Sequence, residues 1–171
     1  NEVGVPTYTK EEEEYAKAII SSYEMTNDDL PGDACDESEE IAAWVDKVSQ
    51  HATIPLNSFL IPYHFSTRQR MGSTDVGDVS WLVPTAQINV VTFPSKAPGH
   101  SWQNVSCGKT SIGHKGLLTA GKVLAATAIE LFENPRYLEQ AKEEFEKRAA
   151  GGYYCPVPDD AVPTVVGGKM D

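Results

Sequence analysis

Two short polar segments of this sequence carry residue types that can do chemistry. The first is Gly72-Ser73-Thr74-Asp75, a turn of small residues that ends in a carboxylate, and the second is Gly99-His100-Ser101. Backbone N–H groups and hydroxyls in such a turn can bind a carboxylate or orient a ligand. An imidazole between two small residues can project into a cleft, where it can bind a metal or transfer a proton. Each segment by itself is a weak signal.

The simplest catalytic and metal sites do not fit these residues. A serine nucleophile needs a paired base, and neither Ser73 nor Ser101 lies in a Gly-x-Ser-x-Gly elbow. The other three histidines do not stand at HxH or HExxH spacing with His100. A single histidine cannot build a zinc or manganese site, because such a site needs at least three protein ligands. A self-contained hydrolase using His100, Asp75 and Ser101 is therefore the least favoured hypothesis.

Composition excludes several classes of protein. The chain has 171 residues, the length of one domain, and 14 basic against 25 acidic residues give a net charge of -11. Such a surface repels phosphate backbones, so nucleic acid is not an expected partner. No apolar run approaches the ~20 residues that a membrane span needs. Three cysteines without a CxxC pair indicate a reducing compartment, and together with the lack of a secretion signal this predicts a cytoplasmic protein.

Four helices are predicted from capping residues and apolar periodicity. Thr9 and Glu12 form a capping box before a helix over residues 10–24, and Ser38 caps a second helix. A long helix over residues 111–132 is followed by another that begins at Pro135. The long helix has its apolar, inward-facing stripe at Leu117, Leu118, Gly121, Leu124, Ala125, Ala128, Leu131 and Phe132.

Two strands are predicted between these helices. Residues 86–93 have the nearly continuous β-branched character of a strand that is covered on both faces, and residues 59–61 form a shorter apolar run. Asp78 is predicted to cap a single helical turn at residues 79–83. Helices that flank a few apolar strands indicate an α/β fold, in which the two polar turns lie at the ends of the strand at residues 86–93.

Three motifs, GSTDVGDVSW, PGHSWQ and SIGHKGLLTAGKVLAATAIELFENP, resemble a known group of enzymes. They are similar in order and spacing to the C-terminal part of metal-dependent amidohydrolases and peptidases of the aminobenzoyl-glutamate utilization protein B type. Carboxypeptidase G, aminoacylase and the indoleacetyl-amino-acid hydrolases are related to that type. The resemblance runs from about residue 4 to residue 158. It implies that residues 1–171 are the C-terminal segment of a zinc-peptidase-like catalytic domain, without the dimerisation domain and the N-terminal catalytic half.

The resemblance also implies roles for the two polar segments. His100 matches a histidine that binds one of two divalent metal ions, zinc or manganese, in the complete enzyme. Residues 72–75 match a loop beside the substrate, and Gly99 and Ser101 are expected in the same substrate wall. The family's His-x-Asp or His-x-Cys pair and its adjacent glutamates have no counterpart here. No catalytic residue is therefore assigned to this chain.

These implications predict a function that depends on other polypeptide. The complete enzyme would hydrolyse N-acyl amides, such as aminobenzoyl-glutamate, by metal-assisted attack of water, while this chain alone would be inactive. Its expected partners are the N-terminal half of the same protein, a small amide substrate, and a second copy of itself, because unpaired strand edges promote association. The alternative is a non-catalytic binding domain that retains the fold without the metal site.

Overall fold

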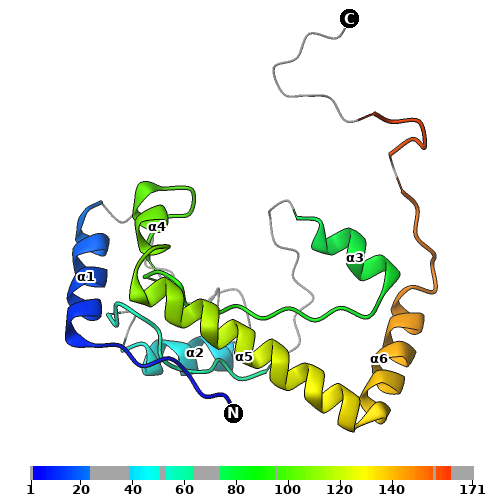
Figure 1. Ribbon diagram of the computed structural model, residues 1–171, viewed down its shortest axis with the longest axis horizontal. Coiled ribbons are helices and arrows are strands. Elements are labelled where there is room, and N and C mark those ends of the chain that lie inside the picture. Colours follow the sequence, from blue (N-terminus) through cyan, green and yellow to red (C-terminus); the bar gives the residue numbers. More distant parts are fainter. Residues whose placement is uncertain are drawn as a thin grey trace, which may run out of the picture. The chain divides into compact units, whose positions relative to one another are not determined.

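The described part of the protein is built of helices joined by irregular segments (Figure 1). The computed structural model describes residues 2–23, 39–50, 53–63, 74–94, 96–155 and 157–162. In these ranges the helices are α1 (Lys10–Ser21), α2 (Glu39–Val48), α3 (Val76–Leu82), α4 (Trp102–Cys107), α5 (Ser111–Glu133) and α6 (Pro135–Arg148). The chain divides into a first unit, Asn1–Gly72 with Ala86–Asn134, and a second unit, Ser73–Thr85 with Pro135–Asp171. No helix in the described ranges has both the length and the apolar composition to span a bilayer.

The four helices predicted from periodicity are present. α1 begins with the expected capping box, since the Glu12 N–H donates to the Thr9 hydroxyl at 3.3 Å and the Thr9 N–H donates to the Glu12 carboxylate at 2.7 Å. α5 begins at Ser111 after an N-cap at Thr110, and α6 begins at Pro135. The capping box and Pro135 located the starts of α1 and α6, because capping residues and proline act on the first helical turn, whatever the rest of the chain does.

The predicted α/β fold is wrong for the described residues, which contain no strand and no sheet. Residues 86–93, predicted as a buried strand, form a stretched irregular segment before α4 (Figure 1). Residues 86–89 are exposed and residues 90–93 are half-buried. The shorter strand predicted at residues 59–61 is also absent. The few-stranded sheet that the helices were expected to flank is therefore not found.

The missing sheet has a physical explanation. A strand exists only when a neighbouring strand pairs with its backbone N–H and C=O groups, and periodicity does not reveal which segment supplies that neighbour. No backbone hydrogen bond joins residues 86–91 to another described segment. The β-branched residues favour an extended backbone, but without a pairing partner that backbone does not become a strand.

The two short helices also differ from the prediction. α3 begins at Val76, so Asp78 lies within its first turn instead of capping it. Asp75 occupies the N-cap position, but its side chain accepts no capping hydrogen bond. α4 was not predicted from the sequence; Ser101, in the predicted polar turn, caps it and accepts a hydrogen bond from the Asn104 N–H. Helices this short leave too few apolar positions for periodicity to detect.

The core of the first unit lies where α1, α4 and α5 meet. One buried cluster contains Ala16, Leu56 and Ile112, and a second contains Ile19, Ala97 and Cys107. Tyr15 of α1 packs against both clusters. The loops that carry Leu56 and Ala97 are therefore held by the same helix contacts that join α1 to α4 and α5.

Gly116 brings α5 into close contact with the segment at residues 91–92. A Cβ atom at this position would overlap the Val91 carbonyl oxygen and would lie 2.7 Å from Thr92 Cγ2. Backbone cannot move away from such an overlap as a flexible side chain can. Glycine at position 116 is therefore what allows this segment to lie directly on the helix.

Gly116→Ala should lower the free energy of unfolding by about 2 kcal/mol, because the overlap forces residues 91–92 away from α5. Gly121→Ala is the matched control on the same helix, since a Cβ there meets nothing within 4 Å. The control should raise stability by up to about 1 kcal/mol, the helix propensity difference between glycine and alanine. Chemical denaturation of both variants measures the two effects, and equal behaviour would contradict the close contact at Gly116.

The apolar stripe of α5 faces away from the core, contrary to the prediction. Leu117, Leu124 and Phe132 are 69%, 63% and 85% exposed. The buried residues of this helix are instead near its start and include Ile112 and Gly116. α5 thus packs through one side and presents a second apolar side to solvent, as a helix does when it has neighbours on both sides in a larger assembly.

Candidate functional site

Gly99, His100 and Ser101 form one turn at the start of α4. The Ser101 hydroxyl donates to the Pro98 carbonyl at 2.6 Å and accepts from the Asn104 N–H at 3.2 Å, so it joins the turn to the helix. His100 and Gly99 are exposed, and Ser101 is half-buried. The metal-binding and substrate-contacting roles expected of these three residues stay predictions.

His100 has a left-handed backbone conformation, with φ of 53°. Non-glycine residues seldom adopt this conformation, which costs roughly 1–2 kcal/mol, although histidine tolerates it better than most. The capped start of α4 on one side and the Ser101–Pro98 hydrogen bond on the other impose it. Strained backbone of this kind is concentrated at functional sites, where the surrounding structure maintains it.

Side-chain hydrogen bonds between α1 and α4 stabilise the turn at residues 99–101. The Tyr15 hydroxyl donates to Ser106 Oγ at 3.0 Å, and Gln103 Nε2 donates to Ser22 Oγ at 3.3 Å. Gln103 is buried, with only 6% of its surface exposed. These side-chain bonds link residues more than 80 positions apart in the chain, and they hold α4, and with it the His100 turn, against α1.

Cys107 of α4 belongs to this support and not to a reactive site. Its thiol is fully buried and donates to the Gln103 carbonyl at 3.3 Å. Burial raises the pKa of the Cys107 thiol, which lowers its nucleophilicity at neutral pH. Cys107 is therefore a small core residue.

Glu12 is the most buried acid described, and sequence reasoning assigned it only the capping box. One oxygen accepts from Lys115 Nζ at 2.7 Å as well as from the Thr9 N–H, and the other accepts from the Ser111 hydroxyl at 2.6 Å. The Glu12 side chain is 8% exposed. Lys115 also donates to the Thr7 carbonyl at 2.8 Å. This network joins the N-terminal segment, α1 and α5, and only the tertiary structure reveals it.

The charges of this network set the titration of its members. Burial alone would raise the pKa of Glu12, but the hydrogen bonds from Lys115, Ser111 and Thr9 outweigh it and lower that pKa to about 2. Burial and the neighbouring Glu12 charge raise the pKa of Tyr8 to about 12. Glu12 is therefore a permanently ionised structural group, unlike a general base, whose pKa must lie near the working pH.

The second polar segment lies at the start of α3, in the second unit. The Thr74 hydroxyl accepts from the Val76 N–H at 3.3 Å, and both Thr74 and Asp75 are exposed. Gly72 and Ser73 lie outside the described residues. Because the two units are described separately, a shared site of residues 72–75 with His100 stays a prediction.

Asp78 of α3 contacts the segment that follows α6. Its carboxylate accepts from the Tyr153 hydroxyl at 3.2 Å, and the Tyr153 ring lies 6.0 Å from the Trp81 ring between centroids. All three residues are exposed. These contacts join the two parts of the second unit and give Asp78 a structural role in place of the helix cap that was predicted.

In the part of the chain that the structure describes, His100 has no neighbours that would complete a metal centre. Among the described residues, no three His, Cys, Asp or Glu side chains are grouped closely enough to hold a metal ion. The remaining donors of a site at His100 would therefore have to come from polypeptide outside these residues. An exposed imidazole on a fixed backbone is suited to such a shared site.

Comparison with known proteins identifies one informative relative. A subunit of the p-aminobenzoyl-glutamate hydrolase of Escherichia coli (strain K12) is 34% identical to this chain over 166 residues. The alignment covers 94% of the chain but 34% of the relative, so the chain spans about a third of its length. No family model and no solved structure matches the chain. The expected resemblance to amidohydrolases of the aminobenzoyl-glutamate utilization type is confirmed, while the resemblance to carboxypeptidase G and aminoacylase stays a prediction.

Proposed function

We propose that this chain is part of a metal-dependent amidohydrolase that hydrolyses N-acyl amides of the aminobenzoyl-glutamate kind. The observation that carries the proposal is the 34% identity to the E. coli p-aminobenzoyl-glutamate hydrolase subunit, which extends over nearly the whole chain. The reaction adds water across the amide bond: the carbonyl carbon gains the oxygen, and the nitrogen leaves as an amine. The substrate would be a small molecule, in agreement with an acidic surface that does not favour nucleic acid.

His100 is the residue of this chain that we assign to the metal centre. Its imidazole would supply one ligand, carried on a turn whose backbone is left-handed at this residue. Bound zinc or manganese ions supply two things to the reaction, a water of lowered pKa and a polarised amide carbonyl. Gly99, Ser101 and the 72–75 turn would form part of the substrate wall.

Catalysis would require polypeptide beyond this chain. His100 provides one donor where a catalytic metal needs at least three protein ligands, and the described residues form no group that could supply the others. The glutamates that the resemblance assigns as metal ligand and general base have no counterpart in this sequence. Glu12 is excluded from that role by its pKa of about 2 and by its three hydrogen bonds. We expect the isolated chain to release no product, and we expect it to act in the cytoplasm as part of the longer enzyme.

A chimera tests this function. The chain would replace the aligned third of the E. coli relative, and the product would be expressed in a strain that lacks that relative. We expect the extract to release p-aminobenzoate from p-aminobenzoyl-glutamate, whereas the isolated chain in the same strain does not. A folded chimera without hydrolysis, or an active isolated chain, would contradict the proposal. A non-catalytic binding domain, the alternative, predicts a folded and inactive chimera.

The exposed apolar side of α5 predicts that the isolated chain self-associates, because Leu117 and Leu124 are more than 60% exposed on it. Replacing both leucines with lysine should shift the sedimentation profile towards monomer. Thr127→Lys, at an exposed position of the same helix, is the matched control and should leave the profile unchanged. A wild-type chain that is monomeric at all concentrations would contradict the prediction.

A further inference from the structure

The turn that carries His100 lies between two buried residues. Ala97, three positions before His100, is 7% exposed and belongs to the cluster that contains Ile19 of α1 and Cys107 of α4. Gln103, three positions after His100, is 6% exposed. The residues between these two are exposed or half-buried. The position of the turn therefore depends on how its two ends are held.

Two chains of hydrogen bonds meet at Gln103. Its Nε2 donates to Ser22 Oγ at 3.3 Å, and the Ser22 hydroxyl donates to the Ile19 carbonyl at 2.6 Å. The Gln103 carbonyl accepts from the Ser106 hydroxyl at 2.8 Å, and Ser106 Oγ accepts from the Tyr15 hydroxyl at 3.0 Å. Both chains end on α1, one through the side chain of Gln103 and the other through its backbone.

A glutamine at this buried position is informative. Burying an amide costs free energy unless it is hydrogen-bonded, whereas an apolar side chain of similar length would fill the space without that cost. A buried polar network whose members are satisfied fixes one arrangement of the elements that it joins. The Gln103 side chain therefore fixes the start of α4, and with it the preceding turn, at one place on α1.

We propose that Gln103 is a positioning residue for the metal centre, which holds the His100 turn against α1 through Ser22. The inference rests on the proposed function, in which His100 supplies one metal ligand, and it adds the residue that keeps this ligand in place. Gln103 acts through the backbone that it shares with the turn and not by contact with the ion. Partners that orient metal ligands contribute about 10–100-fold to metal affinity.

The backbone of His100 provides an independent observation. Its φ of 53° lies in the left-handed region, which a residue in a free turn leaves for a more favourable conformation. Because Ala97 and Gln103 are both anchored, the turn between them cannot relax in this way. The left-handed conformation is the expected consequence of a turn that is held at both ends.

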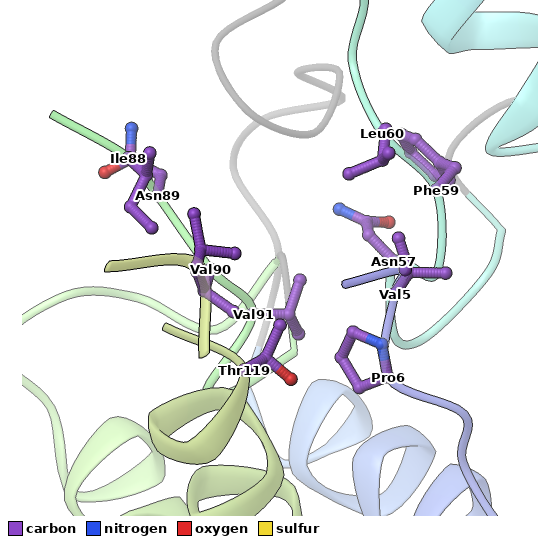
Figure 2. A pocket seen from close by; sticks show the side chains of 12 residues that line it. Val5, Pro6, Asn57, Phe59, Leu60, Ile88, Asn89, Val90, Val91 and Thr119 are labelled. Carbon is purple, nitrogen blue, oxygen red and sulfur yellow. The ribbon is translucent and has the colours of Figure 1, made fainter. Parts of the chain in front are cut away.

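A groove elsewhere in the first unit gives His100 no support. It has a volume of about 210 Å³ and is lined by parts of segments 4–6, 57–60 and 88–91 and by Thr119 and Val123 of α5. Figure 2 shows Val90 and Val91 on one side of the gap, with Asn57 and Val5 on the other. None of the lining residues is charged, and none belongs to α4 or to the turn before it. The contacts with α1 are thus what positions the turn.

Thermal denaturation of the isolated chain tests the link between Gln103 and the strain at His100. His100→Gly should melt about 2–4 °C above His100→Ala, because glycine relieves the left-handed conformation. Gln103→Met keeps the length of the side chain but removes the Nε2 donor, so the turn can relax. In that background the difference should fall below about 1 °C. An unchanged difference would overturn the proposal.

Zinc affinity of the chimera, measured without substrate by competition with a chromophoric chelator, tests the effect on the metal centre. Gln103→Met should weaken zinc binding by about 10–100-fold. Ser22→Ala removes the acceptor of the same bond and should have a similar effect, and the double variant should bind zinc no more weakly than either single variant. Additive losses would contradict a role for the bond between these two residues.

Ser111→Ala is the matched control. It also removes a side-chain hydrogen bond between α1 and a distant helix, the 2.6 Å bond from the Ser111 hydroxyl to Glu12 Oε1, but it leaves α4 untouched. It should lower the melting temperature of the chimera without changing its zinc affinity. An equal loss of zinc affinity in Ser111→Ala and Gln103→Met would show a general structural effect and would overturn the proposal.

His100→Ala separates this inference from the proposed function. If it leaves the zinc affinity of the chimera unchanged, the metal role of His100 is refuted, and positioning by Gln103 is refuted with it. If His100→Ala weakens zinc binding but Gln103→Met does not, the proposed function stands and positioning by Gln103 alone is refuted. Weaker zinc binding in both variants, with unchanged binding in Ser111→Ala, supports the proposal.

Discussion

His100→Ala should reduce p-aminobenzoyl-glutamate hydrolysis by the chimera by at least about 100-fold, because even residues that only orient metal ligands contribute 10–100-fold to affinity or activity. The fold should persist, since His100 is exposed and lies outside both buried clusters. Product release measured at saturating zinc or manganese gives the effect. Exogenous imidazole should restore part of the activity, which a merely structural role would not allow.

His114→Ala is the matched control for this experiment. His114 is also exposed, but it lies within α5 and away from the left-handed turn. It should retain activity within about threefold of the parent chimera, as surface substitutions usually do. Full activity of His100→Ala, or equal losses in both variants, would remove His100 from the metal centre.

The strained backbone at His100 gives this site a second signature. His100→Gly relieves the left-handed conformation that His100→Ala retains, so the glycine variant should be the more stable by about 1 kcal/mol. Both variants should be inactive. A difference of about 2–4 °C between their melting temperatures would measure the strain.

Glu12→Gln should lower the free energy of unfolding by about 2–3 kcal/mol, since it removes the charge that Lys115, Ser111 and the Thr9 N–H all bind. For a chain of this length the melting temperature should fall by about 5–10 °C. Glu13→Gln is the matched control, because Glu13 is the exposed neighbour on the same helix. A loss of similar size in both variants would show that the buried network adds nothing beyond general helix charge.

The same network predicts how stability depends on pH. The pKa of Glu12 is about 2 in the folded chain against 4.5 ordinarily, so below about pH 4.5 the unfolded chain binds a proton that the folded chain does not. The stabilisation is complete above this range and is lost as the pH falls towards 2. The difference in free energy of unfolding between the wild type and Glu12→Gln should therefore shrink between about pH 5 and pH 2. Chemical denaturation at a series of pH values measures it, and a constant difference would contradict the assignment.

Interactions between neighbouring residues could be predicted from the sequence, whereas contacts between distant residues could not. The Thr9–Glu12 capping box and Pro135 located the starts of α1 and α6, because capping involves only neighbouring residues. The same Glu12 also binds Lys115 and Ser111, which are about 100 residues away. No pattern along the chain predicts those contacts, since they depend on α5 lying beside α1.

Apolar patterns were harder to interpret because they report burial without naming the neighbour. The stripe on α5 was interpreted as its inner face, and the structure leaves it exposed while the side that includes Ile112 and Gly116 packs. Residues 86–93 have the composition of a covered strand and occur without a partner among the described residues. One reason explains why both predictions were wrong. A segment has an apolar pattern in its sequence even when the surface that covers it belongs to another stretch of polypeptide.

The sequence by itself determined the four longer helices, the starts of α1, α5 and α6, and the similarity to a p-aminobenzoyl-glutamate hydrolase subunit. Only the tertiary structure decided that residues 86–91 lie beside an uncharged groove without a pairing partner in the described chain, that α5 is apolar on two sides, and that His100 stands on strained backbone. Helix caps and motifs depend on residues close together in the chain, whereas pairing, burial and strain depend on what folding brings beside them.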